Sequence, residues 1–177
     1  AINIGHARKR EHWLGPVVNA SAYANYARYV MDLQAGGAQL IRGGKQLRET
    51  ANGRGYYVGP VLAEANITHP LWKQEMFLPI VMLHRYRDRD DAMRLANDTD
   101  MGLTAGFYGG ADEVPWFQEH IEAGVTYANR PQGATTGAWP GYQPFGGWKG
   151  SGSTGKAIAS FYYLQQYLRE QSRTVVE

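Results

Sequence analysis

Two short segments of the chain combine residue types that could bind a small ligand. The first is the run QEMFLP at residues 74–79, which directly precedes a predicted strand. The Glu75 carboxylate could accept hydrogen bonds from sugar hydroxyls, because an ionised carboxylate is an acceptor with two oxygens. Phe77 could offer an apolar face to a planar ring. A solvated surface glutamate is the alternative interpretation of the same residues.

The second segment is the glycine-rich stretch of residues 130–155. It contains eight glycines and three prolines but only two charged residues, Arg130 and Lys149. Small residues allow backbone N–H groups to approach an anion closely. Its aromatic residues argue against a disordered linker and could form the wall of an apolar pocket, namely Trp139, Tyr142, Phe145 and Trp148. A packed loop without a ligand is the alternative.

Several other chemistries lack the residues that they need. The chain has no cysteine, which excludes disulfides, thiolate metal ligands and a cysteine nucleophile within it. No two of the five histidines have the spacing of metal ligands, so no metal site is expected. The Gly-x-Ser-x-Gly pattern of serine hydrolases is absent, and residues 150–153 lack the Walker pattern of a phosphate loop.

Composition predicts an ordinary globular protein. A length of 177 residues suggests one domain, with 44% hydrophobic and 19% charged residues. The net charge of +2 is small and dispersed, so a nucleic-acid partner is not expected. The sequence has neither an apolar run of 18 residues nor a signal peptide, which predicts no membrane span and a cytoplasmic location. The first residue is not Met, and we interpret this as a processing or truncation point.

Hydrophobic periodicity and turn residues predict alternating strands and helices. Asn19 or Ser21 should cap a helix that extends to about residue 34, Asp90 or Asp91 should start a second helix, and Asp112 should cap a third. Residues 43–55 are expected to form a surface loop. Strands are expected at residues 39–41, 56–58, 61–62, 79–86, 103–108 and 125–128. The order of elements over 79–128 indicates an α/β fold with a mostly parallel sheet and flanking helices.

The C-terminal residues predict a separate role. A short helix is expected around residues 158–164, followed by an alternating apolar stretch from residue 167 to 176. Such a stretch suits an edge strand, which needs a partner sheet that another subunit could supply.

Several motifs in the same order resemble the aldehyde dehydrogenase family. The run FGGWKGSG at residues 145–152 resembles the family's FGGxKxSG motif, and EMFLP at 75–79 resembles its E-[IM]-F-G-P motif, with Leu78 in the place of the usual Gly. The runs GPVV, GLTAG and VTYAN, at residues 15–18, 102–106 and 125–129, resemble further family segments. The resemblance implies the C-terminal part of an α/β catalytic domain over residues 1–163 and an oligomerisation tail over 164–177.

The resemblance also assigns roles to the two segments. Glu75 would hold the nicotinamide ribose of NAD or NADP, and Phe77 would contact the nicotinamide side. The runs TGA at 136–138 and GYQPFGG at 141–147 are similar to those of family members that oxidise glutamate semialdehyde. There the backbone N–H groups of Gly137 and Ala138 would bind the substrate carboxylate, and Phe145 would line its aliphatic chain.

In that family a cysteine thiolate attacks the aldehyde, hydride passes to NAD(P)+, and water hydrolyses the thioester. The nucleophile would lie upstream of the matched region, so the resemblance implies no catalytic residue in this chain and no activity of the chain alone. A missing N-terminal portion or another chain would supply the cysteine, and the assembly would be a homo-oligomer. The alternative is a non-catalytic module that binds a small acid or mediates assembly.

Overall fold

A computed structural model describes residues 2–47, 55–131, 143–152, 156 and 158–177. The chain divides into two compact units, residues 1–85 and residues 86–177, where length alone predicts a single domain. Each unit contains one of the two candidate segments.

Unit 1 is organised by its long helix, α1 (Ala20–Ala35). The helix begins as predicted, because the Asn19 side chain accepts a hydrogen bond of 2.8 Å from the Ala22 N–H group and caps the first turn. It ends at two glycines, the second of which, Gly37, has a φ of 82°. One face of α1 is buried, with residues at helical spacing: Tyr26, Tyr29, Val30 and Leu33.

The strands of unit 1 form two small sheets. β1 (Gln39–Arg42), β4 (Val61–Glu64) and β5 (Ile80–Leu83) are ordered β1-β4-β5, with β1 antiparallel and β5 parallel to β4. β2 (Gln46–Leu47) and β3 (Tyr57–Val58) pair in antiparallel register. β2 falls in the span predicted as a loop, because a two-residue strand has no periodicity to detect. A 3-10 helix, η1 (Pro70–Lys73), precedes β5.

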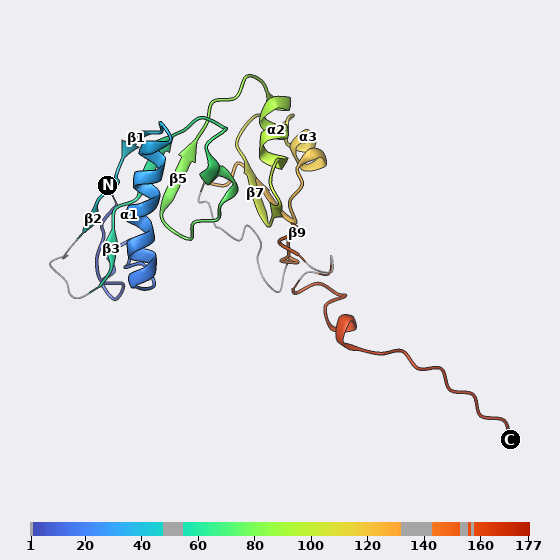
Figure 1. Ribbon diagram of the computed structural model, residues 1–177. Helices are drawn as coiled ribbons and strands as arrows, with labels where there is room; N and C mark the ends of the chain where they lie inside the picture. The colour runs from blue at the N-terminus through green and yellow to red at the C-terminus, as the bar shows by residue number, and fades with distance from the viewer. Residues whose placement is uncertain (1, 48–54, 132–142, 153–155, 157) are drawn as a thin grey trace. The chain divides into compact units, whose positions relative to one another are not determined.

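Helix α1 packs its buried face on these strands to form the core of unit 1 (Figure 1). Tyr26 is completely buried, and its hydroxyl donates a hydrogen bond of 2.5 Å to the Gly59 carbonyl between β3 and β4. Burial raises the pKa of this hydroxyl, so it stays protonated and remains a donor. The other buried residues in and directly after β3 and β4 are apolar: Val58, Val61, Ala63 and Ala65.

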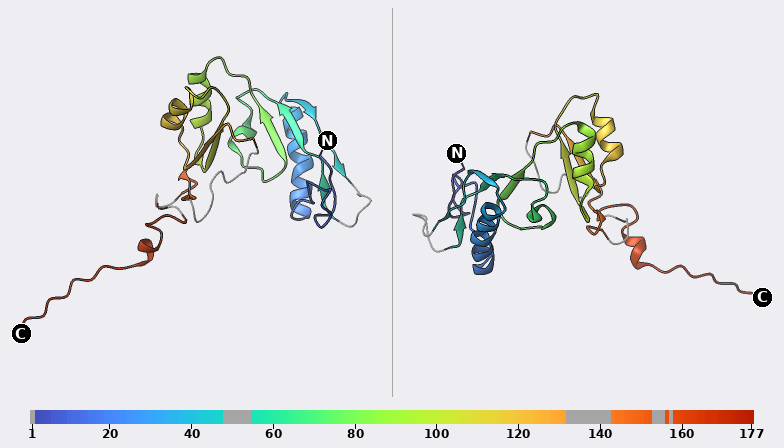
Figure 2. Two further views of the ribbon diagram at one scale, coloured as in Figure 1. Left: turned by 180° about the vertical axis from the view of Figure 1, so that it is seen from behind. Right: turned by 45° about the horizontal axis from the view of Figure 1, so that its top comes forward.

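The described residues of unit 2 form two short α-helices and four short strands. The helices are α2 (Arg89–Asn97) and α3 (Val114–His120), which lie beside each other near β7 in the views of Figures 1 and 2. β7 (Thr104–Phe107) and β8 (Val125–Ala128) pair in parallel, and α3 lies between them in the chain. β6 (Met101–Gly102) pairs with β9 (Trp148–Lys149) in antiparallel register. The core centres on Phe117, whose ring stacks on Phe107 at 5.1 Å.

The α/β class and most element positions are as predicted, but the predicted mostly parallel sheet is not confirmed. The described strands form two parallel and three antiparallel pairs. β5 pairs with β4, the strand that precedes it in unit 1. Periodicity identifies a strand without identifying its neighbour, which explains the difference. Helix α3 also begins one residue later than predicted, with Glu113 instead of Asp112 at its N-cap.

The C-terminal residues differ from the predicted helix and strand. Ile158 forms an antiparallel bridge with Phe145, and a 3-10 helix, η2, spans Leu164–Tyr167. The helix expected around residues 158–164 is wrong, since Ala159 has a φ of 62° and interrupts a helical path. Residues 168–177 are exposed and form no strand with any described residue, so the oligomerisation strand stays a prediction. None of the helices within the described ranges is long and apolar enough to cross a membrane.

Candidate cofactor and substrate site

The cofactor candidates Glu75 and Phe77 lie in the connection between η1 and β5. The Glu75 side chain is exposed and forms no hydrogen bond or ion pair with any residue that the structure describes. Phe77 is 84% exposed and has a φ of 52°, in the left-handed region. A bulky residue in this region is strained, and such strain occurs preferentially at ligand-binding positions. The connection therefore presents an unpaired carboxylate and an uncovered aromatic ring two residues apart.

His69 anchors this connection to helix α1. Its side chain is buried, with 5% exposure. The ring Nδ1 accepts a hydrogen bond of 3.2 Å from the Leu71 N–H group and so caps η1. Because Nδ1 is an acceptor, Nε2 must carry the proton that it shares with the Asp32 carbonyl of α1, at 3.2 Å. The His69 ring lies against Gly36. A Cβ atom at position 36 would come within 2.2 Å of His69 Nε2, so only glycine lets the ring lie this close to the helix.

A second contact holds the residue just before Glu75. The Gln74 side-chain amide donates a hydrogen bond of 2.7 Å to the hydroxyl of Tyr29, a buried residue of α1. Its backbone N–H group also bonds the Leu71 carbonyl at 3.3 Å. The chain is therefore fixed to the core of unit 1 up to Gln74, and its exposed part begins at Glu75.

The substrate candidates belong to unit 2. Gly137 and Ala138 lie outside the described residues. Phe145 is half-buried and is held by two backbone hydrogen bonds with Ile158, of 2.9 and 3.0 Å. It lines an open cleft of about 550 Å³ together with Trp148, Ser151, Ile158 and Tyr163. The cleft combines apolar walls with polar groups, which suits a short aliphatic chain with a polar end.

Glu75 and Phe77 therefore fall in unit 1 and Phe145 in unit 2, and each set is positioned by elements of its own unit. The anchoring residues His69, Gln74 and Tyr29 were not predicted from the sequence. His69 precedes a proline at a turn, which predicts the turn, but histidine is not among the usual helix caps. No group of three potential metal ligands occurs among the described residues.

The site has two parts in an α/β chain: an exposed carboxylate and aromatic ring before β5, and an aromatic, glycine-rich segment that follows β8 and contains β9. Residues 1–172 match the aldehyde dehydrogenase family, and the chain belongs to this family.

Several similar proteins share one name, 1-pyrroline-5-carboxylate dehydrogenase. The chain is 31% identical to 1-pyrroline-5-carboxylate dehydrogenase of Anoxybacillus flavithermus over 99% of its own length and 32% of that protein. It resembles the structure of 1-pyrroline-5-carboxylate dehydrogenase from Thermus with bound NAD, at 33% identity and a TM-score of 0.83. This match covers 95% of the chain and 31% of the Thermus chain. The chain thus spans about a third of the length of these relatives.

A further structural relative has a different substrate in its name. The structure of a 3,6-anhydro-L-galactose dehydrogenase matches with a TM-score of 0.82 at 26% identity, covering 96% of the chain and 34% of that protein. Two relatives that are named for different substrates thus match the fold of this chain with nearly equal TM-scores. The fold alone therefore does not define the substrate.

Proposed function

We propose that this chain is the part of an NAD(P)-dependent aldehyde dehydrogenase that contacts the nicotinamide end of the cofactor and the aldehyde. The reaction would convert L-glutamate 5-semialdehyde to glutamate. The nucleophilic cysteine would lie outside this chain, which has none. The observation that carries the proposal is the unpaired Glu75 carboxylate beside the exposed, strained Phe77, in a chain similar to a Thermus relative with bound NAD.

The proposed cofactor contacts use the carboxylate oxygens of Glu75 and the exposed ring face of Phe77. A carboxylate without a partner can accept hydrogen bonds from both hydroxyls of a ribose, and charge-assisted bonds of this kind are strong. The Phe77 ring offers a face on which a planar nicotinamide can lie. When bound, NAD(P)+ would accept the hydride from the substrate. The residues present therefore fit a dinucleotide, and His69 and Gln74 would hold them in place.

The aldehyde contacts would come from unit 2. Backbone N–H groups of Gly137 and Ala138 would bind the substrate carboxylate, and Phe145 would pack on the aliphatic chain. The names of the relatives support a substrate with a carboxylate, since glutamate semialdehyde is the open form of 1-pyrroline-5-carboxylate. We further propose that the protein acts in the cytoplasm as a homo-oligomer whose interface includes residues 164–177.

The substrate assignment is tested with a Gly137→Val variant of the enzyme that contains this chain. Valine at this position should block the close approach of the carboxylate, because glycine permits backbone geometry that a β-branched residue cannot adopt. Each lost hydrogen bond to a charged group costs about 1.5–3 kcal/mol, so kcat/KM for glutamate semialdehyde should fall about tenfold or more. An uncharged aldehyde of similar length should be oxidised nearly as before.

The matched control is Gly133→Val, the same change four residues upstream in the same glycine-rich segment of the sequence. It should affect neither aldehyde. An equal loss for both aldehydes in Gly137→Val would mean that the variant distorts the site, and no loss for either would place the carboxylate elsewhere.

A further inference from the structure

The run of residues 145–152 contains a charged residue that the proposed contacts do not use. Lys149 follows Phe145 by four positions and lies in β9, paired with Met101 of β6. Its backbone has a φ of 50°, in the left-handed region that a lysine seldom adopts. Backbone strain of this kind persists only where the surrounding structure holds the residue in place.

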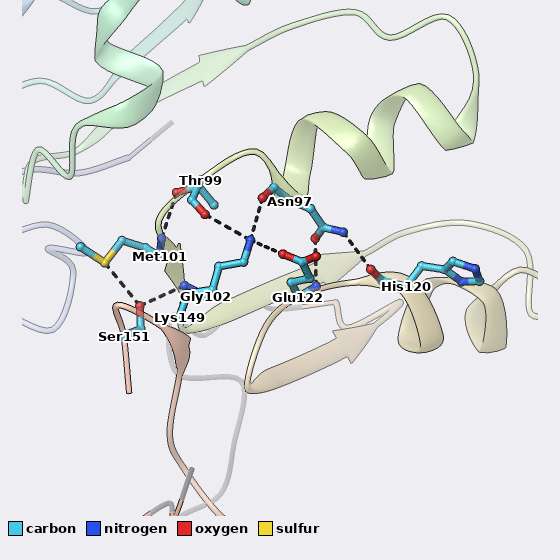
Figure 3. A network of polar contacts seen from close by, with 8 residues as sticks. All are labelled: Asn97, Thr99, Met101, Gly102, His120, Glu122, Lys149 and Ser151. Atoms are coloured by element: carbon cyan, nitrogen blue, oxygen red, sulfur yellow. Dashed lines mark hydrogen bonds and ion pairs between the residues drawn. The ribbon is translucent and has the colours of Figure 1, made fainter. Parts of the chain in front are cut away.

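The Lys149 ammonium has three acceptors around it, as Figure 3 shows. It donates to the Asn97 carbonyl at 2.7 Å and to the Thr99 carbonyl at 3.1 Å, and it forms an ion pair with the Glu122 carboxylate. Three acceptors match the three N–H donors of an ammonium group. The lysine side chain is only 24% exposed, so solvent screens these interactions less than those of an open surface pair.

The partners of Lys149 are themselves connected. Asn97 is the last residue of α2, where carbonyl groups lack helical partners and where a positive charge is favourable. The Asn97 side-chain amide donates to the His120 carbonyl at the end of α3, at 2.8 Å, and its oxygen accepts from the Glu122 N–H group at 2.9 Å. The lysine therefore joins β9 to the C-terminal ends of both helices of unit 2 (Figure 3).

Two further contacts fix the backbone on either side of Lys149. The Ser151 hydroxyl accepts a hydrogen bond of 3.1 Å from the Gly102 N–H group in β6. Gly146 lies against Gly124 before β8, where a Cβ would come within 1.9 Å of the Gly146 carbonyl oxygen. Phe145 directly precedes this contact, so its place in the cleft depends on where the segment sits.

We infer that Lys149 is a positioning residue for aldehyde binding: it ties the segment that carries Phe145 to the ends of α2 and α3 and so sets the position of the substrate loop. The inference rests on the proposed function of Phe145. Lys149 itself needs no contact with the substrate. A displacement of about 1 Å at a reacting or binding group can cost on the order of 100-fold in rate, so loss of the anchor should be visible in the kinetics with the aldehyde, and first in its KM.

The test uses the enzyme that contains this chain, with Lys149→Met to remove the charge at similar side-chain length. The KM for glutamate semialdehyde should rise about tenfold, while the Kd for the dinucleotide should change less than about twofold. Glu122→Gln keeps both carbonyl acceptors and should raise the aldehyde KM by less than Lys149→Met does. Lys45→Met, the same change at an exposed lysine of unit 1, is the matched control and should alter neither constant.

A lower melting temperature with an unchanged aldehyde KM in both Lys149→Met and Glu122→Gln would overturn the inference, because the network would then serve stability alone. If Lys149→Met does not fold, Glu122→Gln decides between the same two results. Phe145→Ala separates this inference from the proposed function. If Phe145→Ala raises the aldehyde KM and the network variants do not, the inference alone fails. If Phe145→Ala has no effect, the assignment of the cleft to the aldehyde fails.

Discussion

The Gln74 side chain donates a hydrogen bond of 2.7 Å to the Tyr29 hydroxyl, which joins residues 45 positions apart in the sequence. The bond fixes the residue immediately before Glu75 to the buried face of α1. The cofactor connection is therefore positioned by a helix that has no ligand-binding role in the proposed function. Its placement relies on this bond and on the contacts of His69 described above.

Tyr29→Phe should weaken dinucleotide binding. The change removes the acceptor hydroxyl and keeps the ring, so packing in the core of unit 1 is preserved. A typical neutral hydrogen bond contributes about 0.5–1.5 kcal/mol, which corresponds to a rise of about two- to tenfold in the dinucleotide Kd. Fluorescence titration of the enzyme that contains this chain measures the dinucleotide Kd.

Tyr162→Phe, at an exposed tyrosine of unit 2, is the control and should leave this Kd unchanged. If Tyr29→Phe and Tyr162→Phe give the same Kd, Gln74 does not position the cofactor.

Asp91 should titrate unusually low. Hydrogen bonds from Arg94, at 2.8 Å, and Arg87, at 3.3 Å, hold the pKa of the Asp91 carboxyl at about 2, below its usual 3.8. Because the folded pKa is depressed, the stabilisation is present above pH about 4 and is lost as the pH falls towards 2. Arg94→Gln should raise this pKa towards 3.8, measured from the carboxyl carbon shift by NMR. Arg89→Gln should leave the Asp91 pKa unchanged. Equal titration curves for the two variants would show that Arg94 is not the main cause of the low pKa.

Local sequence signals predicted local structure well. The Asn19 cap of α1 was confirmed, because a helix start depends on residues three positions apart. The sheet was harder to predict. β5 is the clearest strand in the sequence, yet nothing within it specifies that β4 is its partner.

The candidate site shows the same limit. The motif around Glu75 and Phe77 was visible in the sequence, and the structure adds that both side chains are exposed. The residues that support the site could not be predicted. Lys149 was visible as a motif residue, but its partners lie 27 to 52 positions away, and their proximity follows only from the folding of unit 2.

The tail should contribute to assembly. Residues 168–177 are exposed and include apolar side chains at Leu168, Val175 and Val176 that are covered by no described residue. Deleting residues 167–177 should shift the enzyme towards smaller species in sedimentation velocity, since an unpaired edge strand gains from a partner sheet. Arg10→Gln alters one exposed charge outside the tail and should leave the oligomer intact. An unchanged oligomer after the deletion would place the interface elsewhere.

The most direct test of the central claim is a single-turnover measurement of hydride transfer in the Glu75→Ala variant of the enzyme that contains this chain. If Glu75 holds the nicotinamide ribose, its loss should slow the formation of reduced cofactor by on the order of 100-fold, because the reacting ring is no longer held in place. Glu119→Ala, at an exposed glutamate of α3, should retain the full rate. A Glu75→Ala enzyme that transfers hydride as fast as the unaltered one would contradict the assignment of this connection to the cofactor.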